Sequence, residues 1–293
     1  MKSSFEVLVR AVYEGLTYFE VFDFVPTIRE LHRLVGIAIS EADFQASLEK
    51  MEGVILKNGY VALRGSSDLL FRRLQRNGIS SARITEGRQW GHKLGQLPGV
   101  RAVFLTGSVA AGNGSESDDL DFLVVTSPGR LWLVRLILYL AIRLWKPKVD
   151  LCLNYLVSAS DQAMMMDQNL YVATELAMMV PVYDEGFYRR FMEVNNWRYA
   201  YRPNSNPYPF KSTRPTFRKR ILDLVLSFPI FGLLDWMEMK RAISRLKRLS
   251  WNDEVRVGRE VYKGHFSGHR KSTLTRFRAK VQKRFNKNGE FTA

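Results

Sequence analysis

Two strand-like runs joined by a polar, glycine-containing loop place the strongest constraint on how this chain of 293 residues can fold. The first run, 103–106, ends in Gly107-Ser108, and ten residues later Asp119 and Asp121 alternate with apolar residues. Side chains on a strand alternate between its two faces, so both carboxylates point to the same side. Two neighbouring carboxylates both stay ionised at low cost only when a cation lies between them. The segment therefore predicts a divalent-metal site.

The same segment offers the groups that a phosphate needs. Gly107 lets the backbone approach an anion closely, Ser108 supplies a hydroxyl, and a helix beginning at Ser108 would direct backbone N–H groups at the anion. A third acid, Asp150, stands in an apolar run at the start of the next predicted strand. A lone carboxylate is costly to bury there unless it is paired or binds a cation. Three carboxylates on neighbouring strands beside a phosphate loop predict a two-metal site.

This pattern resembles the DNA polymerase β-like nucleotidyltransferase superfamily. The family places Gly-Gly or Gly-Ser after an apolar residue, then a spacer, then Asp-apolar-Asp-apolar, with a third acid on a later strand. The chain matches at Gly107-Ser108, at 119–122 and at Asp150. The resemblance implies an α+β fold whose core is a mixed sheet with flanking helices. It implies that Gly107 and Ser108 bind the β- and γ-phosphates of a nucleoside triphosphate. Asp119, Asp121 and Asp150 would be the catalytic carboxylates and the ligands of two Mg²⁺ or Mn²⁺ ions.

The implied reaction transfers a nucleoside monophosphate from a nucleoside triphosphate to an acceptor hydroxyl and releases pyrophosphate. In-line attack at phosphorus needs charge neutralisation and alignment more than covalent help, and two divalent ions supply both. Acceptors in this superfamily include RNA ends, proteins and small molecules. Two alternatives stay open: a non-catalytic regulator that binds nucleic acid or nucleotide with a degenerate core, and a nucleotidyltransferase of a toxin–antitoxin pair.

Residues 1–65 predict a winged-helix-like domain, because three helical patterns precede a hairpin around Asn58-Gly59. The helix expected to read DNA, 40–52, carries four acids and one lysine. Its net charge of −3 opposes binding in a phosphate-lined groove, so we expect no DNA binding by this domain. The chain also resembles a group of bacterial nucleotidyltransferase-domain proteins with an N-terminal winged-helix-like region. That resemblance rests on the Gly107-Ser108 core and on four further segments: 22–31, 151–155, Asn196-Trp197 and Pro203-Asn204.

The rest of the chain divides by composition. Residues 66–98 predict a connecting helix, 99–200 the nucleotidyltransferase core, and 201–293 a basic, mainly helical C-terminal region. From 211 to 293 the chain carries 21 Lys and Arg against 7 Asp and Glu, which accounts for +14 of the formal net charge of +15. Such a segment favours a polyanionic partner, RNA first among them, or an anionic membrane, and the simpler interpretation is a solvated basic face. A partner protein is the second choice of acceptor.

Two further places are expected to contact phosphate or acceptor. Asn154 has the same strand parity as Asp150, which brings it near the predicted site. The second place is a basic, glycine-bearing loop before a helix, which suits a bound phosphate. Its candidates are Lys263, His265, Arg270 and Lys271. The loop also holds an i, i+4 histidine pair, but the adjacent glycines oppose the helix that a zinc site would need.

A single cysteine, Cys152, excludes an internal disulfide and fits a reducing compartment, so a cytoplasmic location is expected. The N-terminal apolar run is interrupted by charges, which is not typical of a signal peptide. Two longer apolar stretches, 131–145 and 221–239, are also interrupted by charges and fall short of the roughly 20 residues that span a bilayer. Both predict buried or amphipathic helices, and 221–239 is a candidate for peripheral membrane contact.

Overall fold

The computed structural model describes residues 4–246, 248, 255–264 and 269–285. Its N-terminal unit holds three helices and a hairpin: α1 (Ser4–Glu20), α2 (Ile28–Leu34), α3 (Glu41–Leu48), β1 (Val54–Lys57) and β2 (Tyr60–Leu63). Asn58 and Gly59 both have positive φ, as a two-residue hairpin turn between β1 and β2 requires. The predicted hairpin is therefore present, and a core of Leu31, Phe44 and Val61 joins it to the helices.

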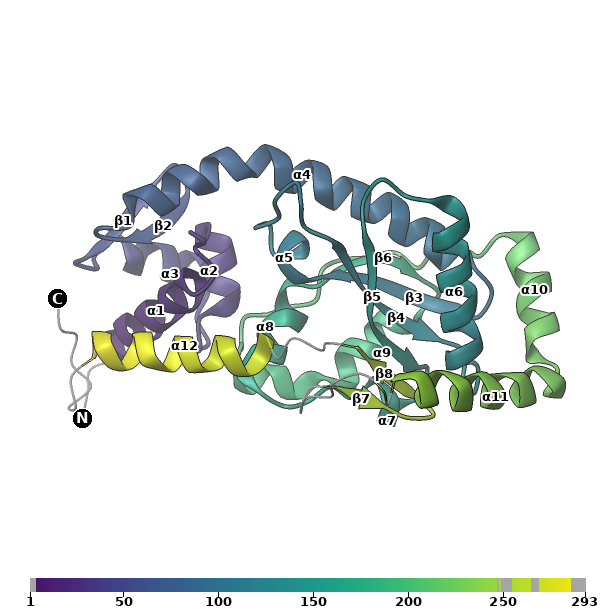
Figure 1. The fold of residues 1–293 in the computed structure, drawn as a ribbon. Coiled ribbons are helices and arrows are strands. Elements are labelled where there is room, and N and C mark those ends of the chain that lie inside the picture. The colour runs from purple at the N-terminus through teal and green to yellow at the C-terminus, as the bar shows by residue number, and fades with distance from the viewer. Residues whose placement is uncertain (1–3, 247, 249–254, 265–268, 286–293) are drawn as a thin grey trace.

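A long helix, α4 (Ser67–Gly95), connects this unit to the central sheet (Figure 1). The predicted connecting helix is present and runs unbroken through Gly78. Gly91 and Gly95 lie against Val182 and Tyr183, so closely that a Cβ at either glycine would collide with these side chains. The absence of side chains at these two positions lets α4 lie directly on the edge of the sheet.

The central sheet has six strands, described over the resolved parts of the chain: β3 (Val100–Thr106), β4 (Leu120–Thr126), β5 (Leu151–Ser158), β6 (Val180–Asp184), β7 (Arg256–Val257) and β8 (Val261–Lys263). Their order is β6-β3-β4-β5-β8-β7. Strands β4 and β5 are parallel and the other neighbours are antiparallel. The predicted α+β class, with a mixed sheet and flanking helices, is confirmed. Strands β7 and β8 extend this sheet beyond 99–200, into the region expected to be mainly helical.

Helices cover both faces of the sheet. The shorter ones are α5 (Gly107–Ala110), α7 (Asp161–Met164), α8 (Leu170–Met178), α9 (Phe187–Val194) and the 3₁₀ helix η1 (Asn196–Ala200). The longer ones are α6 (Leu131–Trp145), α10 (Phe217–Ser227), α11 (Pro229–Leu246) and α12 (His269–Arg284). One core lies between the sheet and α4, α6, α10 and α11, and a second lies between the opposite face and α7, α8 and α9. The sheet is thus buried on both sides, and its functional groups can stand only at strand ends.

The basic helix α12 returns to the N-terminal unit and packs on α1 (Figure 1). Arg284 donates to the Thr17 hydroxyl at 2.6 Å and lies 2.9 Å from Glu20. Arg276 donates to the backbone carbonyl of Val21 at 2.7 Å. Cations are favoured at the carbonyls that end a helix. Part of the C-terminal positive charge therefore holds the two ends of the chain together. Among the described residues, no helix is both long and apolar enough to cross a bilayer.

Candidate metal and phosphate site

The two aspartates of the central motif lie at the start of β4, on the sheet face covered by α8. The parallel register places Asp121 opposite Cys152 of β5. The carboxylate oxygens of Asp119 and Asp121 and the Cys152 sulfur all lie within 4.8 Å of one another. Asp119 is exposed, whereas Asp121 and Cys152 are partly buried. The structure thus brings together the carboxylate pair that strand parity predicted.

The electrostatics of this cluster suit a hard cation. Burial, and then the charge of Asp119, raise the pKa of Asp121 to about 6, against an ordinary value of 3.8. The Asn154 amide donates to Asp121 and offsets part of this shift. Burial and the two carboxylates raise the pKa of the Cys152 thiol to about 12, so the thiol is protonated at neutral pH and donates to Asn154 at 2.8 Å. Carboxylate oxygens without a thiolate are the donor set that Mg²⁺ or Mn²⁺ prefers, and a cation there would relieve the repulsion between the aspartates.

The third predicted acid lies outside the cluster, although its charge acts on Cys152. Asp150 precedes β5, and its backbone carbonyl accepts the Leu120 N–H at 2.8 Å. Asp150 is exposed, and its carboxylate is not part of the cluster formed by Asp119, Asp121 and Cys152. Asn154, in contrast, contacts that cluster directly. The role of Asp150 as a metal ligand stays a prediction, while the expected proximity of Asn154 is observed.

The Gly107-Ser108 turn lies against the aspartates. Gly107 has φ +72°, and a Cβ at this position would collide with the Asp121 carboxylate, so only glycine fits. The Ser108 hydroxyl donates to Asp118 at 2.6 Å, and the Ser115 hydroxyl donates to the same carboxylate at 2.5 Å. Burial raises the pKa of Asp118, but these hydrogen bonds outweigh it and the net shift is downward. An ionised Asp118 therefore holds the Ser108 hydroxyl and closes the loop on itself.

A polar stripe on α4 fixes this loop from outside. Four side chains on one helical face reach it: Arg73, Arg76, Ser80 and Arg83. Arg73 donates to the carbonyl of Gly112, and Ser80 donates to the carbonyl of Gly114 at 3.1 Å. Arg73 also lies 2.9 Å from Glu30 of α2, which ties the loop to the N-terminal unit. Sequence reasoning missed this role, although the i, i+3 and i+4 spacing of these polar residues could have revealed it.

A partly buried acid that the sequence analysis did not single out lies beside the Gly107-Ser108 turn. Glu175 of α8 accepts the backbone N–H of Gly107. Burial, and then the nearby charge of Asp121, raise the pKa of Glu175 to about 7. This contact is made to Gly107, one of the two residues to which the resemblance assigns a nucleotide phosphate. The sequence signal that could have identified Glu175 was a single acid within the otherwise apolar sequence of α8.

The basic loop is only partly described. Three cations surround the carboxylate of Asp167: Arg256 at 3.1 Å, Lys263 at 3.3 Å and Arg270 at 3.5 Å. Two of the predicted phosphate contacts therefore come together, but each already faces this carboxylate. Lys271 is exposed on α12, and His265 lies outside the described residues. A phosphate contact by any of the four stays a prediction.

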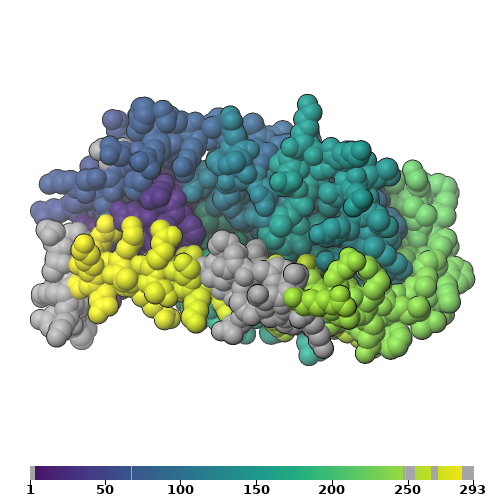
Figure 2. All heavy atoms as spheres, in the orientation of Figure 1, coloured from purple at the N-terminus to yellow at the C-terminus, as the bar shows by residue number. Residues whose placement is uncertain are grey.

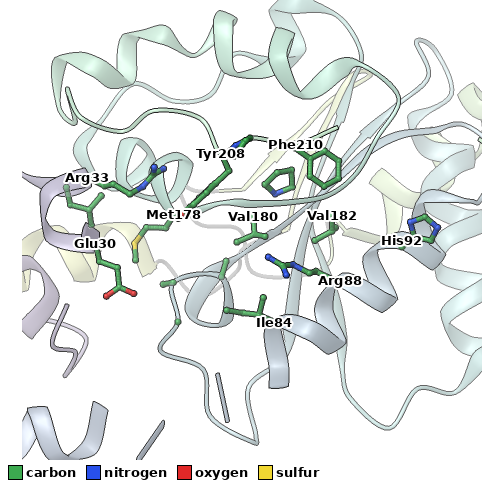
Figure 3. Close-up of a pocket in the computed structure, with 16 residues that line it drawn as sticks. Glu30, Arg33, Ile84, Arg88, His92, Met178, Val180, Val182, Tyr208 and Phe210 are labelled. Carbon is green, nitrogen blue, oxygen red and sulfur yellow. The ribbon is translucent and has the colours of Figure 1, made fainter. Parts of the chain in front are cut away.

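A cavity of about 740 Å³ begins at the end of α5. Figure 3 shows Glu30 and Arg33 of α2 on one side of it, Arg88 and His92 of α4 on another, and Phe210 closing it. Asp119, Asp121 and Cys152 do not line this cavity. The cavity is therefore separate from the cluster, although Ala110 at the end of α5 lines it.

Comparison of the chain with family models, curated proteins and solved structures gave no match. The resemblance to the nucleotidyltransferase superfamily therefore stays a prediction from the residue pattern.

Proposed function

We propose that this chain is a magnesium-dependent nucleotidyltransferase, which moves a nucleoside monophosphate from a nucleoside triphosphate to an acceptor hydroxyl and releases pyrophosphate. The convergence of the Asp119 and Asp121 carboxylates beside the Gly107-Ser108 turn carries this proposal. Two charges on one sheet face favour a divalent cation, and a backbone without a Cβ favours a close phosphate. These are the two requirements of phosphoryl transfer without covalent catalysis.

Each residue has a defined part in this proposal. Asp119 and Asp121 would hold the divalent ions, which when bound neutralise phosphate charge and align the attacking and leaving oxygens. The Asn154 amide orients Asp121, and the Gly107-Ser108 turn would receive the β- and γ-phosphates. Asp150 would complete the site of the second ion and help to activate the acceptor hydroxyl. A loop held by α4 would keep this arrangement rigid, which favours in-line geometry.

The acceptor belongs to one of three classes in this proposal: an RNA end, a protein side chain or a small molecule. The basic C-terminal region supports RNA first, because it concentrates +14 of net charge. The N-terminal unit is proposed as winged-helix-like and without DNA binding. A cytoplasmic location is proposed with the reducing conditions that the single cysteine fits.

The experiment that tests this function is an acceptor screen with α-labelled nucleoside triphosphates. The full chain is incubated with each of the common triphosphates and Mg²⁺ or Mn²⁺, with total RNA or with lysate proteins. Asp119→Asn and Asp121→Asn should abolish label transfer, whereas the matched variant Asp161→Asn, at an exposed ion pair with Arg190, should retain it. Absence of label on every acceptor, together with absence of metal-dependent triphosphate binding by calorimetry, would exclude the enzyme.

One observation favours a second candidate, a nucleotide-binding regulator without transfer activity. The Asp150 carboxylate is not part of the Asp119–Asp121–Cys152 cluster. A core whose third acid lies outside the cluster could still bind a magnesium-nucleotide complex with the other two carboxylates. Metal-dependent triphosphate binding without any label transfer in the same screen would favour this candidate.

A further inference from the structure

Two helices at one end of the molecule carry their large apolar side chains outward. On α10 and the turn that follows it, Phe217 is 79% exposed, Leu224 66% and Phe228 57%. On α11, Leu233, Trp236 and Met237 are each more than half exposed. The spacings of seven and four, and of three and four, place each set on one helical face. These six side chains are named the apolar ridge. Figure 2 shows α10 and α11 forming the end of the molecule away from the N-terminal unit.

The opposite faces of the same helices dock on the protein with buried charged groups as well as with apolar side chains such as Leu226 and Leu246. The Lys219 side chain is fully buried between Glu185 at 2.7 Å and Asp223 at 2.9 Å. Asp235 of α11 is buried and accepts the backbone N–H of Leu133 at 2.8 Å. Both helices are thus apolar on the exposed side as well as on the docked side, whereas an ordinary amphipathic helix exposes a polar face.

Direct contacts hold the ridge in this orientation. Arg130 donates to the carbonyl of Leu226 at 2.7 Å and to those of Ser227 and Phe228 at 3.1 Å each. Rotation of α10 to bury the ridge would break these hydrogen bonds and the Lys219 ion pairs. The apolar side chains are therefore held outward, and large exposed apolar side chains gathered on two neighbouring helices mark a candidate interaction surface.

The charges around the ridge indicate what covers it. Arg214, Arg218, Arg220 and Lys240 are exposed next to the ridge. The acids of both helices face inward, where Glu238 pairs with Arg241 and Asp223 with Lys219. A second copy of the chain would bring two cationic fringes together, which is unfavourable. Apolar and aromatic side chains flanked by exposed cations are typical of helices that lie in the surface of an anionic bilayer.

We propose that α10 and α11 dock the protein on an anionic lipid bilayer. The apolar ridge enters the boundary between headgroups and acyl chains, and the flanking arginines and lysine lie at the level of the lipid phosphates. The helices lie in the plane of the surface and do not cross it. The proposal is independent of the reaction proposed above.

Vesicle sedimentation of the full chain tests this directly. The wild-type chain should sediment with vesicles of phosphatidylcholine containing about a third phosphatidylglycerol, and much less with phosphatidylcholine alone, because the cations need anionic lipid. The triple variant Phe217→Ser, Leu233→Ser and Trp236→Ser should bind about 100-fold more weakly, since three large apolar side chains leave the interface. The control variant Phe71→Ser and Leu74→Ser removes exposed apolar side chains of α4 and should bind as the wild type does.

A conservative variant separates insertion from loss of folding. Brominated lipids should quench Trp236 in the bound wild-type chain, and Trp236→Phe should keep vesicle binding but lose that part of the quenching. The proposal is overturned if the wild-type chain does not sediment with anionic vesicles, if the triple variant binds as well as the control, or if Trp236→Phe leaves quenching unchanged. A dimer in light scattering that the triple variant abolishes, without vesicle binding by the wild type, would instead assign the ridge to a second copy.

Discussion

Replacing Asp121 by asparagine should stabilise the metal-free protein at neutral and alkaline pH while removing its response to magnesium. Burial and the charge of Asp119 raise the pKa of the Asp121 carboxyl to about 6 in the folded chain. The folded chain therefore holds the Asp121 proton to a higher pH than the unfolded chain does. The stability that the protonated carboxyl provides is present below about pH 4 and is lost as the pH rises through about 6.

The magnitude follows from the same difference. Each pH unit between the folded and unfolded pKa corresponds to about 1.4 kcal/mol. The rise from 3.8 to about 6 sets an upper value of about 3 kcal/mol at pH 8. Partial access of water to Asp121 lowers the expected value to about 2 kcal/mol. Asparagine keeps a carbonyl oxygen that can accept from Asn154, so the variant loses the charge and little else.

Urea unfolding of both chains at about pH 8 and about pH 4, with a chelator or with excess Mg²⁺, measures the effect. With the chelator at pH 8, Asp121→Asn should unfold at higher urea than the wild type, and the two should converge at pH 4. Magnesium should stabilise the wild type and leave the variant unchanged, because the cation binds the folded carboxylate pair. A variant that is less stable at both pH values, or that gains as much from magnesium as the wild type, would refute the reasoning.

Three further outcomes are expected. Gly107→Ala should abolish triphosphate binding in calorimetry, because its Cβ would displace the Asp121 carboxylate; retained binding would contradict the tight approach. At pH 8 the thiol of Cys152 in the folded chain should react with iodoacetamide at least about 100-fold more slowly than in the urea-unfolded chain, because burial raises the pKa of the thiol to about 12. Mg²⁺ should speed the reaction of the folded chain. Equal reaction rates in the folded and unfolded chains would contradict a protonated thiol. Lys219→Met should lower the free energy of unfolding by about 3 kcal/mol in urea titration, because it leaves a buried charge on Glu185 without this partner; a change below about 1 kcal/mol would contradict the burial of the pair.

The local sequence was sufficient for the centre of the fold. Strand parity alone placed Asp119 and Asp121 on one face, because alternation on a strand needs no knowledge of its neighbours. The Asn58-Gly59 hairpin was predictable for the same reason, since its turn depends on two residues with positive φ. Parity also placed Asn154 near the site, and the structure brings it to Asp121.

Features that depend on non-local pairing were not predicted. Strand β6 contains Pro181, which argues against a central strand, and it forms because it lies at the edge of the sheet. Strands β7 and β8 are too short to show alternation, and they form only through the pairing of β8 with β5 and of β7 with β8. Parity grouped Asp150 with Asn154, but only Asn154 contacts the cluster, because Asp150 lies at the exposed start of β5.

The sequence also did not show which helical face turns toward the protein. The pattern of 221–239 predicted buried or amphipathic helices, and in an ordinary globular protein the apolar face turns inward. Here both sides of the helices carry apolar side chains, and the buried ion pairs of Lys219 and the contacts of Arg130 help to fix which side turns inward. Partners on other elements therefore contribute to the orientation, and no periodicity within the segment contains that information.

Parallel reactions with α-labelled and γ-labelled triphosphate test the central claim most directly. The full chain, Mg²⁺ and the acceptor found in the screen are combined with each label, and the double variant Asp119→Asn and Asp121→Asn serves as the control. A nucleotidyltransferase transfers the α-label to the acceptor and releases the γ-label as pyrophosphate, and the double variant transfers neither. Transfer of the γ-label, or α-label transfer that survives in the double variant or without divalent metal, would contradict the account.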